Sequence, residues 1–284
     1  MLSTNIALAS KAQVSPVSFA ELTHVANALS LQVANDVAPI WGIQAVVQAF
    51  ERADQIPPGY WPIFVVDPAQ MPQGAGGFHL TKHKQPYAEV ESGTAWSLSA
   101  SHELIEMLVD PSGNRLVAGP ELTANAGTIG EDATQRVEYL VEACDPCEAQ
   151  AQAYLIQDVI VSDFFTPHFH DTVASAGTRY SFTGALTRPR QVLPGGYISW
   201  MDPSTNDMMQ LQYLDQTPRI INLTTQSQLG TESLREFVNR AEAAAAGGAG
   251  VLSRLSESDP LFIRRNHRSV NIREAARVRA QMYV

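Results

Sequence analysis

The spacing of apolar residues predicts that residues 18–53 are mainly helical. Apolar side chains return at helical intervals at Phe19, Leu22, Val25, Leu29 and Val33. Ser18 and Glu21 have the spacing of a capping box, which favours a helix start at this point. Pro39 interrupts the pattern, because the residue before a proline is biased away from the helical conformation. A second short element is expected at residues 44–52.

Short apolar runs bounded by turn residues predict several β-strands. They lie at residues 61–67, 136–144, 153–165, 196–202 and 208–215, and residues 78–92 read as one or two further extended segments. The runs at 196–202 and 208–215 flank a turn and are expected to pair as a hairpin. Pro86 favours an edge position for its segment, because proline cannot donate a ladder hydrogen bond.

Two more helices are expected at residues 96–109 and 232–246. The first ends at Asp110-Pro111 and the second at Gly247, which are typical helix stops. Glycine, proline, threonine and asparagine dominate from residue 112 to about residue 135, which predicts a loop.

The helix at residues 96–109 and the residue after it carry an unusual polar face. At 100° per residue, His102, Glu103, Glu106 and Asp110 fall within a sector of roughly 100°, and apolar residues occupy the opposite side. A solvated face is one interpretation, but such faces usually mix charge signs and this one has no base. Glu106 and Asp110 also lie near the helix C-terminus, where the helix dipole disfavours each negative charge by up to ~1 kcal/mol. A metal ion or a buried arginine would compensate.

The sequence HELIE at residues 102–106 resembles the zincin metallopeptidase motif H-E-x-x-H, with Glu106 in place of the second histidine. The resemblance implies that His102 and Glu106 are metal ligands and that Glu103 is the general base in peptide hydrolysis. The implied cofactor is zinc or another divalent cation. A carboxylate is a harder ligand than imidazole, so the substitution shifts the preference from zinc towards calcium or manganese.

A third ligand is expected from outside this helix. Asp110 lies eight residues after His102, a rise of about 12 Å, too far for one metal to bind both. Glu142 is the first candidate, because gluzincin-type sites use a downstream glutamate. A solvent-facing position on a strand is the alternative for Glu142.

Three further residues are weaker candidates. Asp145 and Glu148 share the segment of Glu142 and form a separate cation site or cap a turn. His79 lies on the extended segment that precedes the helix. In zincins such a strand lines the substrate cleft, although a lone strand histidine is more often structural.

Cys144 and Cys147 form a single C-x-x-C, which is too few ligands for a structural zinc site and is interpreted as two structural thiols. His168 and His170 are candidates to complete a Cys2His2 site, to reach the helix as ligands or substrate contacts, or to belong to a surface loop.

The resemblance extends beyond the motif. Residues 61–167 are similar to an uncharacterised group of bacterial and phage-encoded proteins, which implies a shared fold. The expected class is α+β: a zincin-like domain with a mixed sheet and an active-site helix, plus a C-terminal helical tail. The expected division is an N-terminal helical segment at 1–56, a zincin-like body at 57–249 and a basic helical tail at 250–284.

The net charge of −10 comes from 29 acidic and 19 basic residues and argues against general nucleic-acid binding. From Arg254 onward, seven arginines and three acids give +4, so the preceding residues carry −14. The basic tail is therefore expected to contact protein, either in self-assembly or with a partner. No apolar run is long enough for a transmembrane helix, and no secretory leader is recognised. The expected location is the cytoplasm or a viral particle.

The sequence is compatible with two functions from different classes. The first is a metal-dependent hydrolase that acts on a peptide or protein substrate. The second is a non-catalytic structural or assembly protein, such as a component of a phage particle, with a degenerate zincin-like fold.

Overall fold

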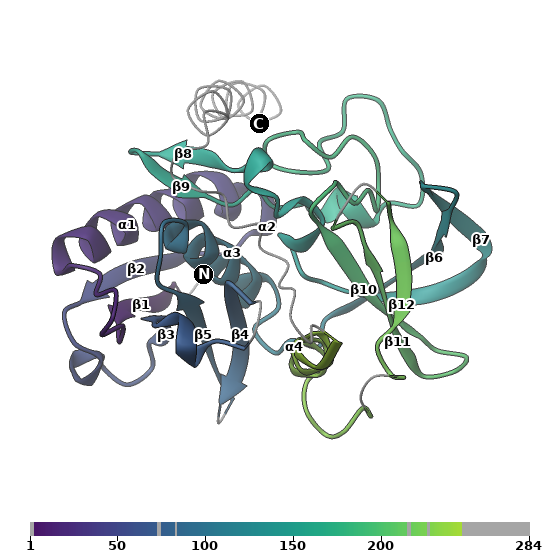
Figure 1. Ribbon diagram of the computed structural model, residues 1–284. Coiled ribbons are helices and arrows are strands. Elements are labelled where there is room, and N and C mark those ends of the chain that lie inside the picture. The colour runs from purple at the N-terminus through teal and green to yellow at the C-terminus, as the bar shows by residue number, and fades with distance from the viewer. Residues whose placement is uncertain (1–2, 73–74, 83, 215–216, 226–227, 246–284) are drawn as a thin grey trace.

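The computed structural model describes residues 3–245 except 73–74, 83, 215–216 and 226–227. Two five-stranded sheets lie side by side, with helices packed against the first sheet and between the two (Figure 1). The expected α+β class is confirmed. The predicted tail at 250–284 lies outside the described residues.

The first sheet has the order β2-β1-β3-β5-β4 and is mixed. Its strands are β1 (Thr4–Ser10), β2 (Ala45–Phe50), β3 (Trp61–Val66), β4 (Gly77–Lys82) and β5 (Gln85–Glu91). The strands β2, β1, β3 and β5 run parallel, and β4 is an antiparallel edge strand paired with β5. Pro86 lies at the start of β5, before its pairing with β3 begins, so the inner strand tolerates it.

The helical interpretation of residues 44–52 is wrong, because this segment contains β2. Burial alternates from Ala45 to Gln48, the period of a strand with one buried face. The sequence pattern does not predict strand β1, although β1 is an inner strand that pairs with both β2 and β3. Residues 1–56 are therefore not purely helical, and their strands join the same sheet as β3.

Helix α1 (Phe19–Gln32) begins where the sequence predicts. The hydroxyl of Ser18 accepts a hydrogen bond of 3.2 Å from the backbone N–H of Glu21, as a cap should. The Glu21 side chain does not complete the capping box and instead accepts a hydrogen bond from Trp96 Nε1 at 2.8 Å. A π-helical turn at Val33–Val37 leads into α2 (Ala38–Trp41), whose first turn accommodates Pro39.

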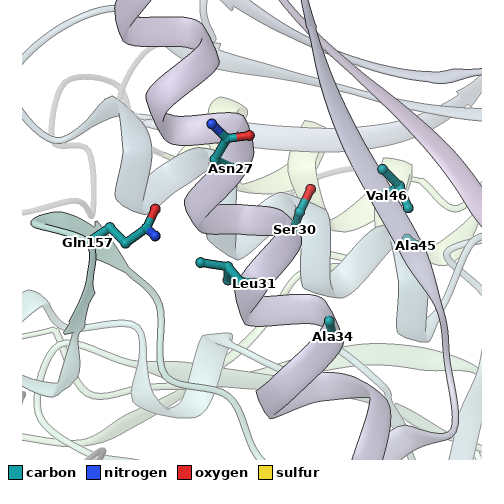
Figure 2. Close-up of a pocket in the computed structure, with 7 residues that line it drawn as sticks. All are labelled: Asn27, Ser30, Leu31, Ala34, Ala45, Val46 and Gln157. Atoms are coloured by element: carbon teal, nitrogen blue, oxygen red, sulfur yellow. The ribbon is translucent and has the colours of Figure 1, made fainter.

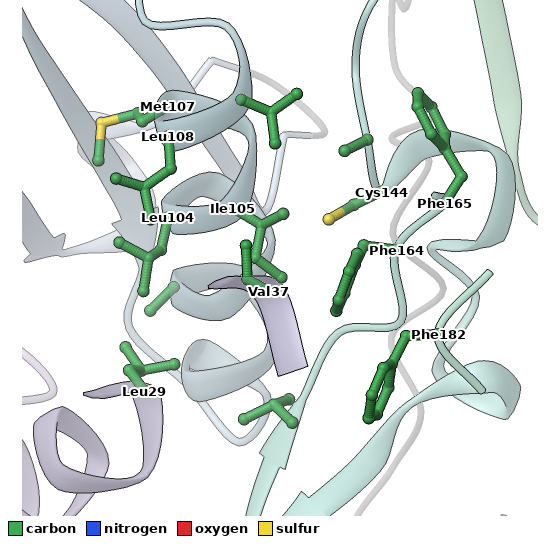
Figure 3. Packing of buried hydrophobic residues seen from close by; sticks show 14 of the residues in the cluster. Leu29, Val37, Leu104, Ile105, Met107, Leu108, Cys144, Phe164, Phe165 and Phe182 are labelled. Atoms are coloured by element: carbon green, nitrogen blue, oxygen red, sulfur yellow. The ribbon is translucent and has the colours of Figure 1, made fainter. Parts of the chain in front are cut away.

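Helix α3 (Trp96–Val109) has the predicted bounds but is buried on both faces. Leu104, Met107 and Leu108 extend to one side, and Ile105 extends towards Phe164 (Figure 3). The interpretation of its polar face as solvated is therefore wrong. The helix ends at Asp110, whose carboxylate accepts hydrogen bonds from the Ser112 hydroxyl and the Arg115 backbone N–H.

The second sheet is antiparallel with the order β12-β11-β10-β7-β6. Its strands are β6 (Leu116–Asn125), β7 (Thr128–Leu140), β10 (Tyr197–Asp202), β11 (Asp207–Gln212) and β12 (Arg219–Asn222). The predicted β10–β11 hairpin is confirmed. The predicted loop up to residue 135 is wrong, because β6 and the first part of β7 form a long hairpin there. The strand predicted at 136–144 ends at Leu140.

The strand expected at residues 153–165 is a small hairpin of β8 (Tyr154–Ile156) and β9 (Val159–Val161). Helix α4 (Leu234–Ala245) confirms the helix predicted near the end of the body. It packs through Phe237, Val238 and Ala241 on a cluster that also contains Leu140 and Met208, separate from the main core. Among the described residues no helix has both the length and the apolar character needed to cross a membrane.

Candidate metal centre

Four parts of the chain bring ionisable side chains into one buried cluster. Helix α3 supplies His102, Glu103 and Glu106, strand β4 supplies His79, the segment after β7 supplies Glu142, Asp145 and Glu148, and α4 supplies Arg235. None of these residues is more than 8% exposed. Such burial of charge is costly unless the groups are paired or bind a cation.

His102 lies between two carboxylates. Its Nε2 atom is 3.2 Å from Glu106 Oε2, one helical turn away, and 3.1 Å from Asp145 Oδ1. Neither oxygen has a partner in hydrogen-bond geometry within the described residues. The other Glu106 oxygen, Oε1, accepts a hydrogen bond of 3.0 Å from the backbone N–H of Cys144 and so fixes the carboxylate.

Glu103 faces the edge strand β4. His79 Nδ1 makes a 3.0 Å hydrogen bond with Glu103 Oε2 and lies 3.7 Å from Glu106 Oε2. On the other side of the ring, His79 Nε2 is 3.7 Å from Glu142 Oε2. Gly77 leaves room for Glu103, because a Cβ atom at Gly77 would lie 2.6 Å from Glu103 Oε1.

Several buried polar atoms of this cluster have no hydrogen-bond partner among the residues that the structure describes. They are Glu106 Oε2, Asp145 Oδ1, Glu148 Oε1, His79 Nε2, both carboxylate oxygens of Glu142 and the donor Nε of Arg235. Leaving such an atom unpaired costs about 1–3 kcal/mol. Two ligands with bonds of about 2.1 Å to one metal are about 3.0–3.4 Å apart, close to the contacts around His102 Nε2.

Arg235 supplies part of the missing positive charge. Its Nη1 atom donates to Asp145 Oδ2 at 3.2 Å and to the Tyr197 hydroxyl at 3.3 Å, and lies 3.8 Å from Glu142 Oε2. A buried arginine was one of the two counter-charges expected from the sequence, yet nothing in the sequence around Arg235 identified this residue. One guanidinium does not balance the five carboxyl groups of the cluster.

The pKa shifts describe the same imbalance. Burial raises the pKa of Glu142 well above its ordinary value, and the carboxylates of Glu106 and Asp145 raise it further against the effect of Arg235. Burial also raises the pKa values of Glu148 and Asp145. Glu106 behaves differently, because His102 and Arg235 outweigh its burial and lower its pKa. Burial therefore makes Glu142, Asp145 and Glu148 resist ionisation in the metal-free cluster. Glu106 and Asp145 raise the pKa of His102 well above its ordinary value, although its burial acts in the opposite direction.

Potential metal ligands form four overlapping triads in which all ligand atoms lie within 4.8 Å of one another. The triads are His102–Glu106–Cys144, His79–Glu103–Glu106, His102–Asp145–Glu148 and Glu106–Glu142–Asp145. The cluster thus contains His102, Glu103, Glu106 and Glu142, all named from the sequence, and also the weaker candidates His79, Asp145 and Glu148. The sequence favours Glu142 over Asp145 as the third ligand. In the structure, however, Asp145 Oδ1 lies only 3.1 Å from His102 Nε2.

Other sequence candidates lie elsewhere. Asp110 closes the turn after α3, in agreement with its exclusion as a ligand. Cys147 is a buried free thiol and belongs to none of the triads. His168 pairs with Asp171 near the surface, and His170 packs against the rings of Phe165 and Phe169. The four residues of the expected Cys2His2 alternative therefore do not form a triad of ligands within the described chain.

A separate depression lies between α1, β2 and the β8–β9 turn (Figure 2). Asn27, Ser30, Val46 and Gln157 are among its lining residues, and none of the residues that line it is acidic, basic, histidine or cysteine. It offers no group for acid–base or metal chemistry.

Comparisons with protein-family models, with curated proteins and with solved structures found no match to this chain. The interpretation of the cluster therefore depends on its own geometry.

Proposed function

We propose that the protein is a zincin-like, metal-dependent hydrolase of the peptidase class. In this proposal His102, Glu106 and Glu142 hold a divalent cation, with Asp145 beside them, and Glu103 is the general base. The observation that carries the proposal is the set of buried nitrogen and oxygen atoms around Glu106 and Asp145 that approach one another without hydrogen bonds. A shared cation would account for these contacts, because ligands of one metal approach one another to about 3.0–3.4 Å. Direct pairing with a protonated His102, whose pKa the two carboxylates raise against the effect of burial, is the competing explanation that the metal analysis below tests.

The fold supports the zincin-like part of the proposal. The sheet is mixed, and its antiparallel edge strand β4 precedes the helix that carries the motif. His79 on this strand faces Glu103, so the edge strand and the motif meet at the cluster. This is the relationship that the zincin resemblance implies between a cleft strand and an active-site helix.

The contacts of Glu103 suit a base. Its carboxylate hydrogen-bonds His79 and packs against Gly77, and it lies beside Glu106 without being needed in the Glu106–Glu142–Asp145 triad. A bound divalent cation would polarise a substrate carbonyl and acidify a water molecule. Glu103 would accept the proton and deliver it to the leaving amine.

A non-catalytic role is the second candidate, and burial favours it. Catalytic metal sites keep a position open to substrate, whereas structural sites are enclosed by protein. With His102 the most exposed member of the cluster at 8%, a peptide cannot reach the site unless covering elements move. A metal that only stabilises the fold, as in an assembly protein, would suit this closed arrangement.

Elemental analysis of the purified protein tests the metal. Wild type is expected to retain a divalent cation, and His102→Ala and Glu106→Ala to lose it. His24→Ala is the matched control, because His24 is exposed on α1. Wild type that binds no divalent cation after dialysis against one would rule out both the hydrolase and the structural metal site.

The Glu103→Gln variant separates the two candidates. If Glu103 is the base, the variant keeps its metal and loses cleavage of a fluorogenic peptide library by about 100-fold or more. Metal-loaded wild type without any cleavage above that of the Glu103→Gln variant would favour the non-catalytic role.

A further inference from the structure

The ligand atoms of the cluster gather around two points. Glu106, Glu142 and Asp145 form one triad, and His102, Asp145 and Glu148 form another. Asp145 belongs to both. Its Oδ2 atom is already engaged by Arg235, whereas Oδ1 has no hydrogen bond and faces His102 Nε2 at 3.1 Å.

Glu148 is the residue that a single cation leaves unexplained. It follows the short helical turn Asp145–Cys147 and is only 7% exposed. Its Oε1 atom has no hydrogen-bond partner within the described residues. One of its carboxylate oxygens lies in a triad with Asp145 and His102. A cation at Glu106 and Glu142 would not satisfy this atom, so Glu148 points to a second position.

The cluster has five carboxyl groups and one guanidinium, that of Arg235. Asp145, Glu148 and His102 offer ligand atoms within 4.8 Å of one another, so a second cation at this position would lie next to two carboxyl groups.

We propose that the cluster binds two divalent cations bridged by the Asp145 carboxylate. The first lies between Glu106 and Glu142, and the second between His102 and Glu148. The inference rests on the proposed metal centre and divides the same ligands between two positions. Glu103 stays outside both, held by His79. Because most ligands are carboxylates, manganese(II) is the matching probe, and two-metal centres of this type have separations of about 3.5–4 Å.

The stoichiometry of manganese(II) binding tests the inference without reference to activity. Chelator-treated wild type is titrated calorimetrically, and the loaded protein is examined by electron paramagnetic resonance. The expected result is two equivalents with the spectrum of an exchange-coupled pair. Glu148→Gln should bind one equivalent and show an isolated six-line spectrum. Glu51→Gln, at an exposed position, is the matched control and should bind two.

The possible outcomes test the second cation position and the metal centre as a whole separately. One equivalent in wild type would overturn the second site and leave the proposed metal centre standing, whereas none would overturn both. Two uncoupled equivalents that Glu148→Gln does not change would place the second cation elsewhere and overturn the inference. If Glu148→Gln fails to fold, the stoichiometry and coupling of wild type decide the question.

Discussion

Oδ2 of Asp145 accepts a 3.2 Å hydrogen bond from Nη1 of Arg235, and both side chains are almost wholly buried. The contact joins the first turn of α4 to the segment after β7, across 90 positions of sequence. A cation is unfavourable at a helix N-terminus, because the helix dipole is positive there. The position of Arg235 is therefore explained by the acidic cluster that it contacts.

Replacing Arg235 with methionine should strongly destabilise the metal-free protein. The change removes one partner of a buried charged pair and leaves carboxylates uncompensated, which typically costs 3–5 kcal/mol. The free energy of unfolding is measured by urea denaturation in the presence of a chelator. Arg240→Met on the same helix is the control and should cost less than ~1 kcal/mol, since the pair of Arg240 with Glu232 is partly exposed. Equal losses in the two variants would contradict this role of Arg235.

Substitution of Gly77 by alanine should disturb Glu103. The added Cβ would lie 2.6 Å from Glu103 Oε1, and such overpacking costs about 1–3 kcal/mol. In a Glu103→Ala background, the Gly77→Ala change should lower the free energy of unfolding much less, because the clashing atoms of Glu103 are then absent. A double-mutant cycle measured by thermal or urea denaturation gives the coupling between the two positions. Additive effects would show that Gly77 does not serve to accommodate Glu103.

His170 should make the protein sensitive to acid. Burial, together with the charges of Arg190 and Arg115, lowers its pKa to about 4, and neither ring nitrogen has a hydrogen bond within the described residues. The folded state therefore favours neutral His170. Its stabilising effect is full above the unfolded pKa of about 6.5 and declines as the pH falls towards 4, by up to about 3 kcal/mol.

The variant His170→Phe keeps an aromatic ring beside Phe165 and Phe169 and removes this titration. Unfolding measured from pH 7 to pH 4 should show a smaller loss of stability than in wild type. His168→Gln is the control, because His168 lies near the surface in a pair with Asp171. An acid response in His170→Phe as steep as that of wild type would refute the prediction.

Cys144 and Cys147 should resist thiol reagents while the protein is folded. Both are free and at most 1% exposed, and burial raises the pKa of each thiol well above its ordinary value. The thiolate is the form that attacks a disulfide reagent, so both low accessibility and a raised pKa slow the reaction. With a chromogenic disulfide reagent at pH 8, we expect two thiols to react promptly only after denaturation. Rapid labelling of either one in the native protein would count against their burial.

The sequence predicts an element well where cap or stop residues define its ends. Helix α3 has strong apolar periodicity and ends at Asp110-Pro111, and its predicted bounds match those observed. The sequence pattern does not distinguish strand β2 from a helix, because a run of six residues is too short for periodicity to separate the two. The composition of residues 112–135 is typical of loops and therefore does not predict the β6–β7 hairpin that they help to form. The segment is sheet because β6 and β7 pair along it, and β7 pairs with the distant strand β10 only at Glu138 and Tyr139.

The sequence alone determined that His102, Glu103 and Glu106 would share one helix face and that this face needed a positive charge. Helical geometry is local, so the spacing of these residues was sufficient. The sequence also indicated Glu142 as a candidate ligand. The zincin-like hydrolase remains a prediction from the HELIE motif at residues 102–106. Only the tertiary structure decided that the face is buried, that Asp145 contacts His102, and that His79 and Arg235 complete the cluster. Contacts between distant segments depend on sheet pairing and on packing of the core, and residue spacing does not encode either.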